Sequence, residues 1–568
     1  MRVRSIALLL GFALGALTSL RPESGSAART PEDERIDSIL ARMTLREKAA
    51  QMVMPWIEGG LEPGTAAHRR AERLVTVHRV GGFIVGKGSR ARTASSLARL
   101  QQRSKVPLLI GADLEWGAGM RLLGGTLLPV AMALGAAGDS ALAYAHGRAT
   151  AVEARASGIN MVFAPVLDVN TDPRNPIINT RSFGADPDAV ARLGVAVSRG
   201  LRDGGVLAVG KHFPGHGATD SDSHVALPTV AANRARLDSI ELVPFRAVAK
   251  DRIGGLMTAH IALPAITGDH VPATLSRRIT TGIIRDDLRY DGLIITDALN
   301  MAAVTKSGTA ASVAVGAVRA GADILLQPPN AEAAIDAIIA GVRRGAISSA
   351  RIDASVRRIL RAKGRLTNRS AIASRVDPAL ADTIAARSIT LLRDSTPLPL
   401  PRDKRVLSLV YSAVAVPGGP SDALDFTLRG AGVDLVRRTL PTRRAALVAD
   451  SLLAAWQEGS APLVLVSTYA HPVAGAKTTG LPAPVAASLE RIARATPTIH
   501  VVFGDPYVAA NVPSARTVLL AWSGIPAAQR AAARALLGTQ SLGGRSPVPI
   551  AAAYPLGAGL DRPADNEQ

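Results

Sequence analysis

The sequence contains no cysteine, which excludes a disulfide framework and a lipid anchor on an N-terminal cysteine. Aromatic residues make up only 3% of the chain, which argues against a platform that stacks the bases of single-stranded nucleic acid. Beyond the N-terminal region, no uninterrupted apolar segment approaches the roughly 20 residues of a membrane-spanning helix. We therefore expect a soluble mature protein that binds no nucleic acid and does not insert stably into a membrane.

The net charge of +20 has two interpretations. It could indicate an anionic partner, or it could reflect an Ala- and Arg-rich composition spread over helix surfaces. No run of five basic residues occurs, and basic residues do not alternate with aromatic ones. The pattern favours the compositional interpretation.

The N-terminus has the order of an export signal. Arg2 and Arg4 precede an apolar run over residues 6–20, and the small residues SGSAA follow at 24–28. We expect cleavage after Ala27 or Ala28, and hence a secreted or periplasmic protein with a signal peptide over residues 1–28; an uncleaved membrane anchor is the alternative.

After the signal, short apolar runs alternate with helical stretches. Thr30 before Pro31, and Thr44 three residues before Glu47, are typical helix starts. Because the runs are almost continuously apolar, they predict strands that are buried on both faces. Eight of them over about 330 residues predict an α/β fold with an N-terminal (β/α)8 TIM-like barrel. The predicted strands are 51–55, 82–85, 107–112, 160–164, 205–209, 253–258, 292–296 and 323–327.

A chain of 568 residues is long for one hydrophobic core, so we expect two domains. We predict the barrel over 29–366, a linker over 367–385 and a smaller α/β sandwich domain over 386–568. The strands predicted for the second domain are 405–411, 433–437, 462–467, 499–503 and 517–522.

Polar residues follow four of the barrel strands. They are Asp113, the pair Lys211-His212, His260 and Asp297. Because the carboxyl ends of all eight strands face one mouth of a barrel, these side chains are predicted to converge on an active site. His260 is expected to line its floor.

The segment KHFPGHGATDSDSH, residues 211–224, carries three of the ten histidines. Residues 205–211 match the start of a phosphate-binding loop, but His212 stands where that motif needs Ser or Thr. Pro214 and the neighbouring glycines prevent a helix that would present two histidines to one metal ion. A metal site built by the loop from Asp220, Asp222 and His224 remains an alternative, although we expect no metal and no cofactor.

Acid–base chemistry is the interpretation that the loop favours. In an extended segment Asp222 and His224 project to the same side, so the carboxylate can orient the imidazole for proton transfer. The chain has no cysteine and no serine in a G-x-S-x-G turn, which disfavours acyl transfer. Asp297, at the end of its predicted strand, is the best candidate nucleophile.

These segments resemble glycoside hydrolase family 3, and within it the β-N-acetylglucosaminidase (β-N-acetylhexosaminidase) subgroup. The resemblance covers almost the whole mature chain, and the histidine-bearing loop distinguishes this subgroup from the family's glucosidases. It is carried by KHFPGHG with DSH, TDALNM, MTLREKAAQM, RSFGADP, MTAHIALP and PATLS in the first domain, and by ARSITLLRD and GRSPVPI in the second.

The resemblance implies a role for each matched residue. Asp297 would form a covalent glycosyl–enzyme intermediate, and His224 would act as acid/base, oriented by Asp222. Trp116 stands where the family usually has glycine. The residues implied to hold substrate hydroxyls are Asp113, Arg121, Arg181, Lys211 and His212. Glu115, Glu153 and Asp168 are expected to be structural or supporting residues, with Asp168 the best candidate for a closer role.

The predicted function is that of a retaining, exo-acting β-N-acetylglucosaminidase on cell-wall-derived or chitin-derived saccharides, working as a monomer. A neutral imidazole repels anions less than a carboxylate does, so phosphate could replace water as acceptor. The alternatives are a β-N-acetylglucosaminide phosphorylase or β-glucosidase of the same family, a metal-dependent hydrolase, and a carbohydrate-binding protein without activity.

Overall fold

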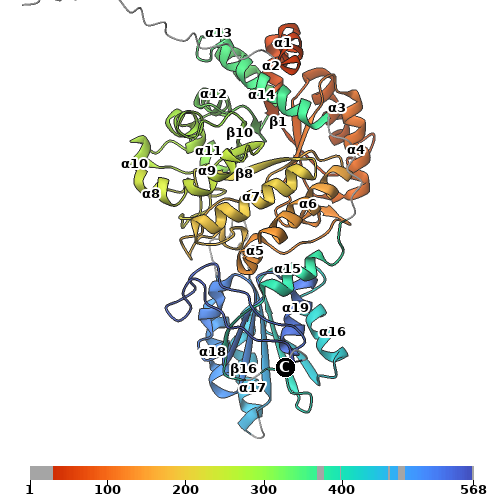
Figure 1. Ribbon diagram of the computed structural model, residues 1–568, viewed down its shortest axis with the longest axis vertical. Helices are drawn as coiled ribbons and strands as arrows, with labels where there is room; N and C mark the ends of the chain where they lie inside the picture. Colours follow the sequence, from red (N-terminus) through yellow and green to blue (C-terminus); the bar gives the residue numbers. More distant parts are fainter. Residues whose placement is uncertain (1–29, 368–375, 397, 458–460, 471–479, 566–568) are drawn as a thin grey trace, which may run out of the picture.

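The structure is a computed structural model that describes residues 30–367, 376–396, 398–457, 461–470 and 480–565. The predicted signal peptide lies outside the described residues, as does part of the predicted linker. Figure 1 shows an upper body that ends with the helix over Ser349–Thr367 and a lower body formed by the rest of the chain. None of the helices described is both long and apolar enough to cross a membrane.

Eight parallel strands form the barrel of the upper body. Seven elements form one sheet in the order β10-β9-β8-β7-β5-β3-β2, and β1 pairs with β11. A bridge between Ile295 and Ile324 joins β10 to β11, while β1 and β2 are separated only by Pro55, which closes the ring. The strands are β1 (Val53–Met54) continued by β2 (Trp56–Ile57), β3 (Gly82–Val85), β5 (Leu109–Ala112), β7 (Met161–Val162), β8 (Leu207–Phe213), β9 (Gly255–Thr258), β10 (Leu293–Thr296) and β11 (Leu325–Leu326).

Each of these strands overlaps one of the eight predicted strands, so the barrel prediction is confirmed. The predicted helix starts are also found: Thr30 caps a helix with Pro31 at its first position, and Thr44 and Glu47 form a reciprocal capping box. The helices of this domain are α1 (Pro31–Arg42), α2 (Leu45–Gln51), α3 (Ala66–Arg73), α4 (Arg90–Arg103), α5 (Ala131–Ala137), α6 (Ser140–Ala156), α7 (Pro187–Asp203), α8 (Arg234–Ser239), α9 (Leu242–Lys250), α10 (Pro264–Thr267), α11 (Ala302–Thr305), α12 (Ala310–Ala320), α13 (Ala331–Arg343) and α14 (Ser349–Thr367). A π-helical segment, Arg278–Asp287, follows α10 between β9 and β10, and the short strands β4 (Gly88–Ser89) and β6 (Leu122–Leu123) pair outside the barrel.

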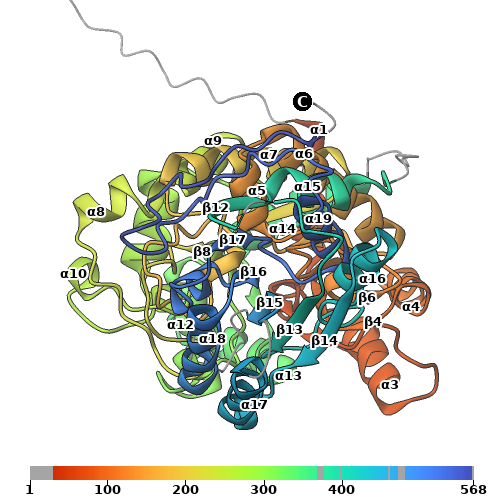
Figure 2. The ribbon, with the colours of Figure 1, turned by 90° about the horizontal axis from the view of Figure 1, so that it is seen from below.

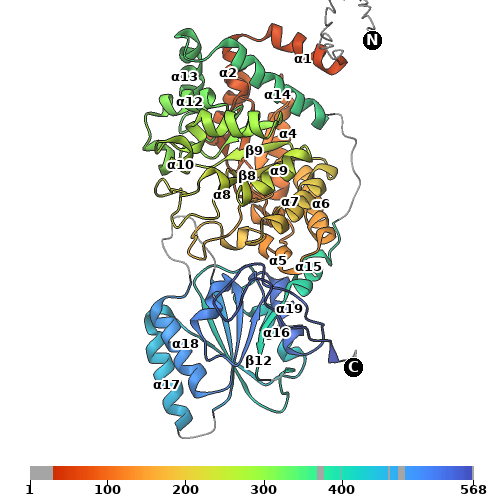
Figure 3. The ribbon, with the colours of Figure 1, turned by 60° about the vertical axis from the view of Figure 1, so that its left-hand side comes forward.

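The second body is an α/β sandwich around a six-stranded sheet in the order β12-β17-β16-β15-β13-β14. All neighbours are parallel except β12, which runs antiparallel to β17. Helices α17 and α18 cover one face and α16 and α19 the other, and Figure 3 shows the two helical layers. The elements are α15 (Leu380–Ser388), β12 (Thr390–Asp394), β13 (Val406–Ser412), α16 (Asp422–Gly430), β14 (Leu435–Thr439), α17 (Ala445–Gln457), β15 (Leu463–Ala470), α18 (Ala483–Ala495), β16 (Thr498–Gly504), β17 (Thr517–Leu520) and α19 (Pro526–Leu536).

The five strands predicted for this domain are present, and β12 is an additional strand that the sequence analysis missed. The domain boundaries stay a prediction. Helix α15 begins inside the predicted linker, runs three residues past its end, and packs against α5 of the barrel and α19 of the sandwich.

The two bodies meet through helix α5 and a loop of the barrel, and Figure 2 shows the second sheet in front of the barrel. Asn170, in the loop after β7, donates a hydrogen bond from Nδ2 to the hydroxyl of Tyr507 at 2.8 Å. The backbone N–H of Ala185 donates to the carbonyl of Pro547 at 2.8 Å. The sandwich domain therefore contacts a loop that belongs to the rim of the barrel.

Candidate active site

The carboxyl ends of the barrel strands surround a cavity of about 740 Å³. Its described lining residues run from Trp56 to Gln327, so all of them come from the barrel. Seven of the eight predicted site residues line it, and the eighth, Asp222, lies directly behind His224. The seven are Asp113, Arg121, Arg181, Lys211, His212, His224 and Asp297.

A network of charges forms one wall of the cavity. Lys211 Nζ lies 2.7 Å from Asp113 Oδ1 and 2.7 Å from Glu115 Oε1. Arg121 reaches the other oxygen of Asp113 at 3.2 Å. Arg181 donates to both oxygens of Glu115, at 2.9 and 2.8 Å, in a bidentate pair. The arrangement fixes the direction of several polar groups without a bound ligand.

Burial alone would raise the pKa values of the carboxyl groups in this wall. In Asp113 this effect is outweighed by Lys211 and Arg121, so its pKa lies below the ordinary value. The pKa of Glu115 is lowered in the same way by Arg181 and Lys211. Burial would lower the pKa of Lys211, but Asp113 and Glu115 raise it instead. Both carboxylates are therefore ionised and the lysine is charged at neutral pH.

Glu115 is closer to the centre of the site than its expected supporting role implies, because it lines the cavity and links Lys211 to Arg181. One feature of the sequence could have indicated this role: Glu115 stands only two residues after Asp113, which was itself predicted to be in the site. Glu153, by contrast, accepts hydrogen bonds from Thr126 and does not line the cavity.

Asp168 holds the loop that follows β8. Its Oδ2 lies 2.7 Å from His212 Nδ1, and its Oδ1 accepts from the backbone N–H of His216 at 2.7 Å. Burial would raise the pKa of Asp168, but the contacts with His212 and His216 lower it. Since the Nδ1 hydrogen of His212 points to Asp168, Nε2 faces the cavity side, where Arg181 lies 3.5 Å away.

The predicted His–Asp pair is present in the loop. His224 Nδ1 lies 2.8 Å from Asp222 Oδ1, which also accepts from the backbone N–H of His224 at 2.8 Å. The Asp222 side chain is 4% exposed, whereas that of His224 is 46% exposed. The hydrogen bond that His224 donates to Asp222 raises the pKa of His224. Nε2 is thereby left for proton exchange at the open side of the cavity.

His216 holds the loop that carries Asp222 and His224. Its Nδ1 lies 2.7 Å from Thr219 Oγ1 and its Nε2 lies 3.1 Å from Ser223 Oγ. Burial lowers the pKa of His216 to about 4, so the ring is neutral at physiological pH. A neutral ring between two hydroxyls therefore shapes the loop.

Asp297 follows β10 and lines the cavity. Its Oδ1 accepts from the backbone N–H of Ala298 at 2.7 Å. Burial would raise its pKa, but His260, His212 and the Ala298 N–H outweigh burial and lower it. His260 does not line the cavity as expected, because its ring is buried with Nδ1 on Thr274 and Nε2 on the Ala298 carbonyl. It therefore holds Ala298, the residue that follows Asp297, and does not face the cavity.

The metal-site alternative finds no support in the geometry of the described residues, since no group of three His, Asp or Glu side chains is placed to hold an ion.

The sequence analysis did not assign apolar residues to the lining of the cavity, because a large apolar side chain beside a strand end is equally typical of the hydrophobic core. Trp116, at the position where the resemblance led us to expect glycine, is one of the residues that line the cavity.

Replacing Glu115 with glutamine is expected to destabilise the fold by about 3 kcal/mol, because two largely buried cations lose a shared counter-ion. KM should rise as well, since Arg181 and Lys211 lose their fixed directions. Urea unfolding and steady-state kinetics measure the two effects. Glu153→Gln is the matched control, with a loss of stability but an unchanged KM. An unchanged KM in Glu115→Gln would contradict the proposed positioning role.

The comparison with known proteins agrees with this geometry. A model of the glycosyl hydrolase family 3 N-terminal domain matches residues 44–362, more than half of the chain, and the chain belongs to this family. A β-N-acetylglucosaminidase/β-glucosidase of Cellulomonas fimi is 30% identical over 511 residues, which span 83% of this chain and 88% of the relative.

Two solved structures are similar over nearly the whole chain. A family 3 β-N-acetylglucosaminidase from Paenibacillus sp. str. FPU-7 has a TM-score of 0.79 and 36% identity, covering 89% of this chain and 99% of its own. The β-glucoside phosphorylase BglX has a TM-score of 0.81 and 26% identity, covering 92% and 97%. Both matches extend through the two domains.

Proposed function

We propose that the protein is a retaining, exo-acting β-N-acetylglucosaminidase that removes terminal β-linked N-acetylglucosamine by way of a covalent intermediate on Asp297. The observation that carries the proposal is the His224–Asp222 pair at the open side of the cavity that Asp297 lines. The names of the Cellulomonas and Paenibacillus relatives support the choice of sugar.

The first step needs an ionised nucleophile and a protonated acid in one cavity. The lowered pKa of Asp297 keeps it ionised, so that it can attack the anomeric carbon. The raised pKa of His224 keeps more of the imidazole protonated near neutral pH, so that Nε2 can protonate the leaving oxygen. The C–O bond to the leaving group breaks as the bond to Asp297 forms.

In the second step neutral His224 takes a proton from water, and the water oxygen displaces Asp297 with overall retention of configuration. Asp222 stabilises the imidazolium that forms. Sugar hydroxyls would be held by the charged wall, with Asp113 as acceptor and Arg121, Arg181 and Lys211 as donors. His212, held by Asp168, would add a further polar contact.

The test is turnover of an aryl β-N-acetylglucosaminide against an aryl β-glucoside, each with and without phosphate. The proposal predicts turnover of the acetamido sugar, no acceleration by phosphate, and a retained anomeric configuration in the first product. A preference for the glucoside would contradict the proposed specificity and indicate a β-glucosidase. Acceleration by phosphate with a sugar phosphate as product would establish a phosphorylase, the candidate that the similarity to BglX favours.

Asp222→Asn is expected to move the alkaline limb of kcat/KM to lower pH by roughly half a unit to one unit. The sign follows from the hydrogen bond and charge of Asp222, which raise the pKa of His224; without them the acid loses its proton at lower pH. A pH profile measures the shift. Asp220→Asn, an exposed acid of the same loop, should leave the limb in place. An unmoved limb in Asp222→Asn would refute the pairing.

We also propose that the protein is exported and acts as a monomer on saccharides from cell-wall turnover or chitin. The charged N-terminus, apolar run and small residues up to Ala28 support export. Mass spectrometry of the mature protein would find a chain that begins at residue 28 or 29, and an intact N-terminus would contradict cleavage. Sedimentation gives the oligomeric state.

A further inference from the structure

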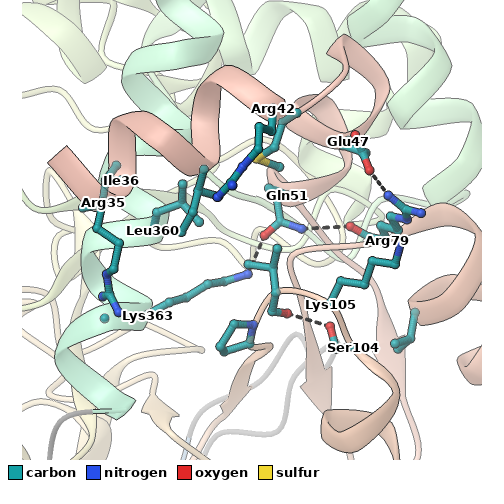
Figure 4. Close-up of a pocket in the computed structure, with 16 residues that line it drawn as sticks. Arg35, Ile36, Arg42, Glu47, Gln51, Arg79, Ser104, Lys105, Leu360 and Lys363 are labelled. Atoms are coloured by element: carbon teal, nitrogen blue, oxygen red, sulfur yellow. Dashed lines mark hydrogen bonds and ion pairs between the residues drawn. The ribbon is translucent and has the colours of Figure 1, made fainter. Parts of the chain in front are cut away.

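A second cavity, of about 520 Å³, lies at the opposite end of the barrel from the candidate active site. Gln51, Arg79 and Lys105 line it, and each lies a few residues before the strand that it precedes, β1, β3 and β5 respectively. Helices α1 and α14 complete the walls, and Figure 4 shows Lys363 extending from α14 toward Gln51. We call it the basic cavity.

Five cationic side chains and one carboxylate line the basic cavity. The carboxylate, Glu47, is paired with Arg79. Among the described residues, no carboxylate lies within ion-pair distance of the other four cations, so the lining carries a large excess of positive charge. The five cations are Arg35, Arg42, Arg79, Lys105 and Lys363.

Lys363 is the most unusual of these groups. Its residue is 3% exposed, and its Nζ donates to the neutral Oε1 of Gln51 at 2.6 Å. Gln51 in turn donates from Nε2 to the backbone carbonyl of Arg79 at 2.9 Å. Burial lowers the pKa of Lys363 to about 7. A buried ammonium group with one neutral acceptor is costly, and an anion beside it would remove much of that cost.

The other buried lysine in the part of the chain described here shows how such a charge is normally compensated. Lys211 has two carboxylates at 2.7 Å, and its pKa is raised. Lys363 has neither, although it opens onto a cavity large enough for a small ligand. The compensating charge for Lys363 is therefore expected to come from outside the chain.

We propose that the basic cavity is a binding site for a small, multiply charged oxyanion that carries carboxylate or phosphate groups. Guanidinium groups such as those of Arg35 and Arg42 bind both groups through paired hydrogen bonds. Lys105 and Lys363 add ammonium donors from two other elements. The site is independent of the proposed glycosidase activity, because its lining shares no residue with the candidate active site.

Calorimetric titration of the full-length protein at constant ionic strength tests the proposal, with citrate and tripolyphosphate as separate probes. We expect saturable binding of at least one probe. Arg42→Gln and Lys363→Met should each weaken it by about tenfold or more, the effect of losing a charge-assisted hydrogen bond. Arg443→Gln, which removes an exposed charge from the sandwich domain, is the matched control and should bind as the unaltered protein does.

Proton uptake provides a second readout that surface charge alone would not give. A bound anion raises the pKa of Lys363, so binding above pH 7 should take up a proton, and affinity for citrate, which stays fully ionised, should fall as the pH rises. Titration in buffers of different ionisation enthalpy measures the uptake. The uptake should persist in Arg42→Gln and vanish in Lys363→Met. The other charged groups that line the cavity are Arg35, Arg42, Glu47, Arg79 and Lys105.

The titration results either identify the class of ligand or overturn the proposal. Binding of tripolyphosphate alone would indicate a phosphate ligand, and binding of citrate would indicate a carboxylate ligand. The absence of saturable binding, or binding that Arg42→Gln and Lys363→Met leave unchanged, would overturn the proposal. Full glycosidase activity in both variants would show that neither has unfolded, and it separates this test from that of the proposed function.

Discussion

Replacing Asp297 with alanine is expected to lower kcat/KM for an aryl β-N-acetylglucosaminide by about 10⁴-fold or more, the scale seen when a covalent nucleophile is removed. The carboxylate lines the cavity, is held by the Ala298 N–H at 2.7 Å, and has a lowered pKa. It is therefore ionised and oriented before substrate arrives. Asp113 and Glu115, which line the same cavity, are tied to cations, so neither is free for attack.

Added azide distinguishes loss of the nucleophile from loss of the fold. In Asp297→Ala, azide can occupy the vacated space and attack the anomeric carbon directly, which gives the inverted, α-configured glycosyl azide. Asp297→Asn, which keeps the shape and can still accept from Ala298, should be equally inactive but should not be rescued. An Asp297→Ala enzyme with undiminished activity would assign the nucleophile to another residue.

The barrel was predictable because its strands are short and buried on both faces. Such strands appear in the sequence as continuous apolar runs, for example 292–296, and do not alternate between apolar and polar residues. The missed strand β12 lies at a sheet edge and ends in the partly exposed Arg393 and Asp394, so it lacks that signature. Strands in the sandwich interior, such as Leu463–Ala470, are apolar again and were found.

The candidate site was predictable to the extent that its residues follow strand ends or share one loop. Asp113, Lys211 and Asp297 converge because barrel topology brings all strand ends together. Sequence cannot assign partners among charges that are far apart along the chain. Glu115 and Arg181 are 66 positions apart, and Asp168 and His212 are 44 positions apart. Only the folded structure brings these pairs together.

The spatial distribution of the basic residues could not be predicted from the sequence, for the same reason. No basic run exists along the chain, so the sequence favoured a diffuse excess of arginine. Folding nevertheless gathers Arg35, Arg42, Lys105 and Lys363 from distant segments around one cavity. A local concentration of charge can thus arise from a composition that looks evenly spread, and the basic cavity is where an anionic ligand would be sought.

Replacing His224 with alanine is expected to lower kcat/KM by about 10²- to 10⁴-fold, the usual contribution of a general acid–base group. The loss should grow as the leaving group becomes a weaker acid. A nitrophenolate leaves without much protonation, whereas a sugar alkoxide requires it. Measuring kcat/KM across a series of aryl glycosides and a natural disaccharide gives this dependence directly. His270→Ala, an exposed histidine elsewhere on the barrel, should leave every substrate unaffected.

Azide again reports the role of the missing group, with the opposite stereochemical result. In His224→Ala the nucleophile Asp297 is intact, so azide attacks the glycosyl–enzyme intermediate and gives the β-configured product. The α-azide from Asp297→Ala and the β-azide from His224→Ala would together assign the two halves of the double displacement. An α-azide from His224→Ala would contradict a covalent intermediate on Asp297, and a leaving-group-independent loss in that variant would mean that His224 only shapes the loop. The proton would then have to come from another group at the open side of the cavity.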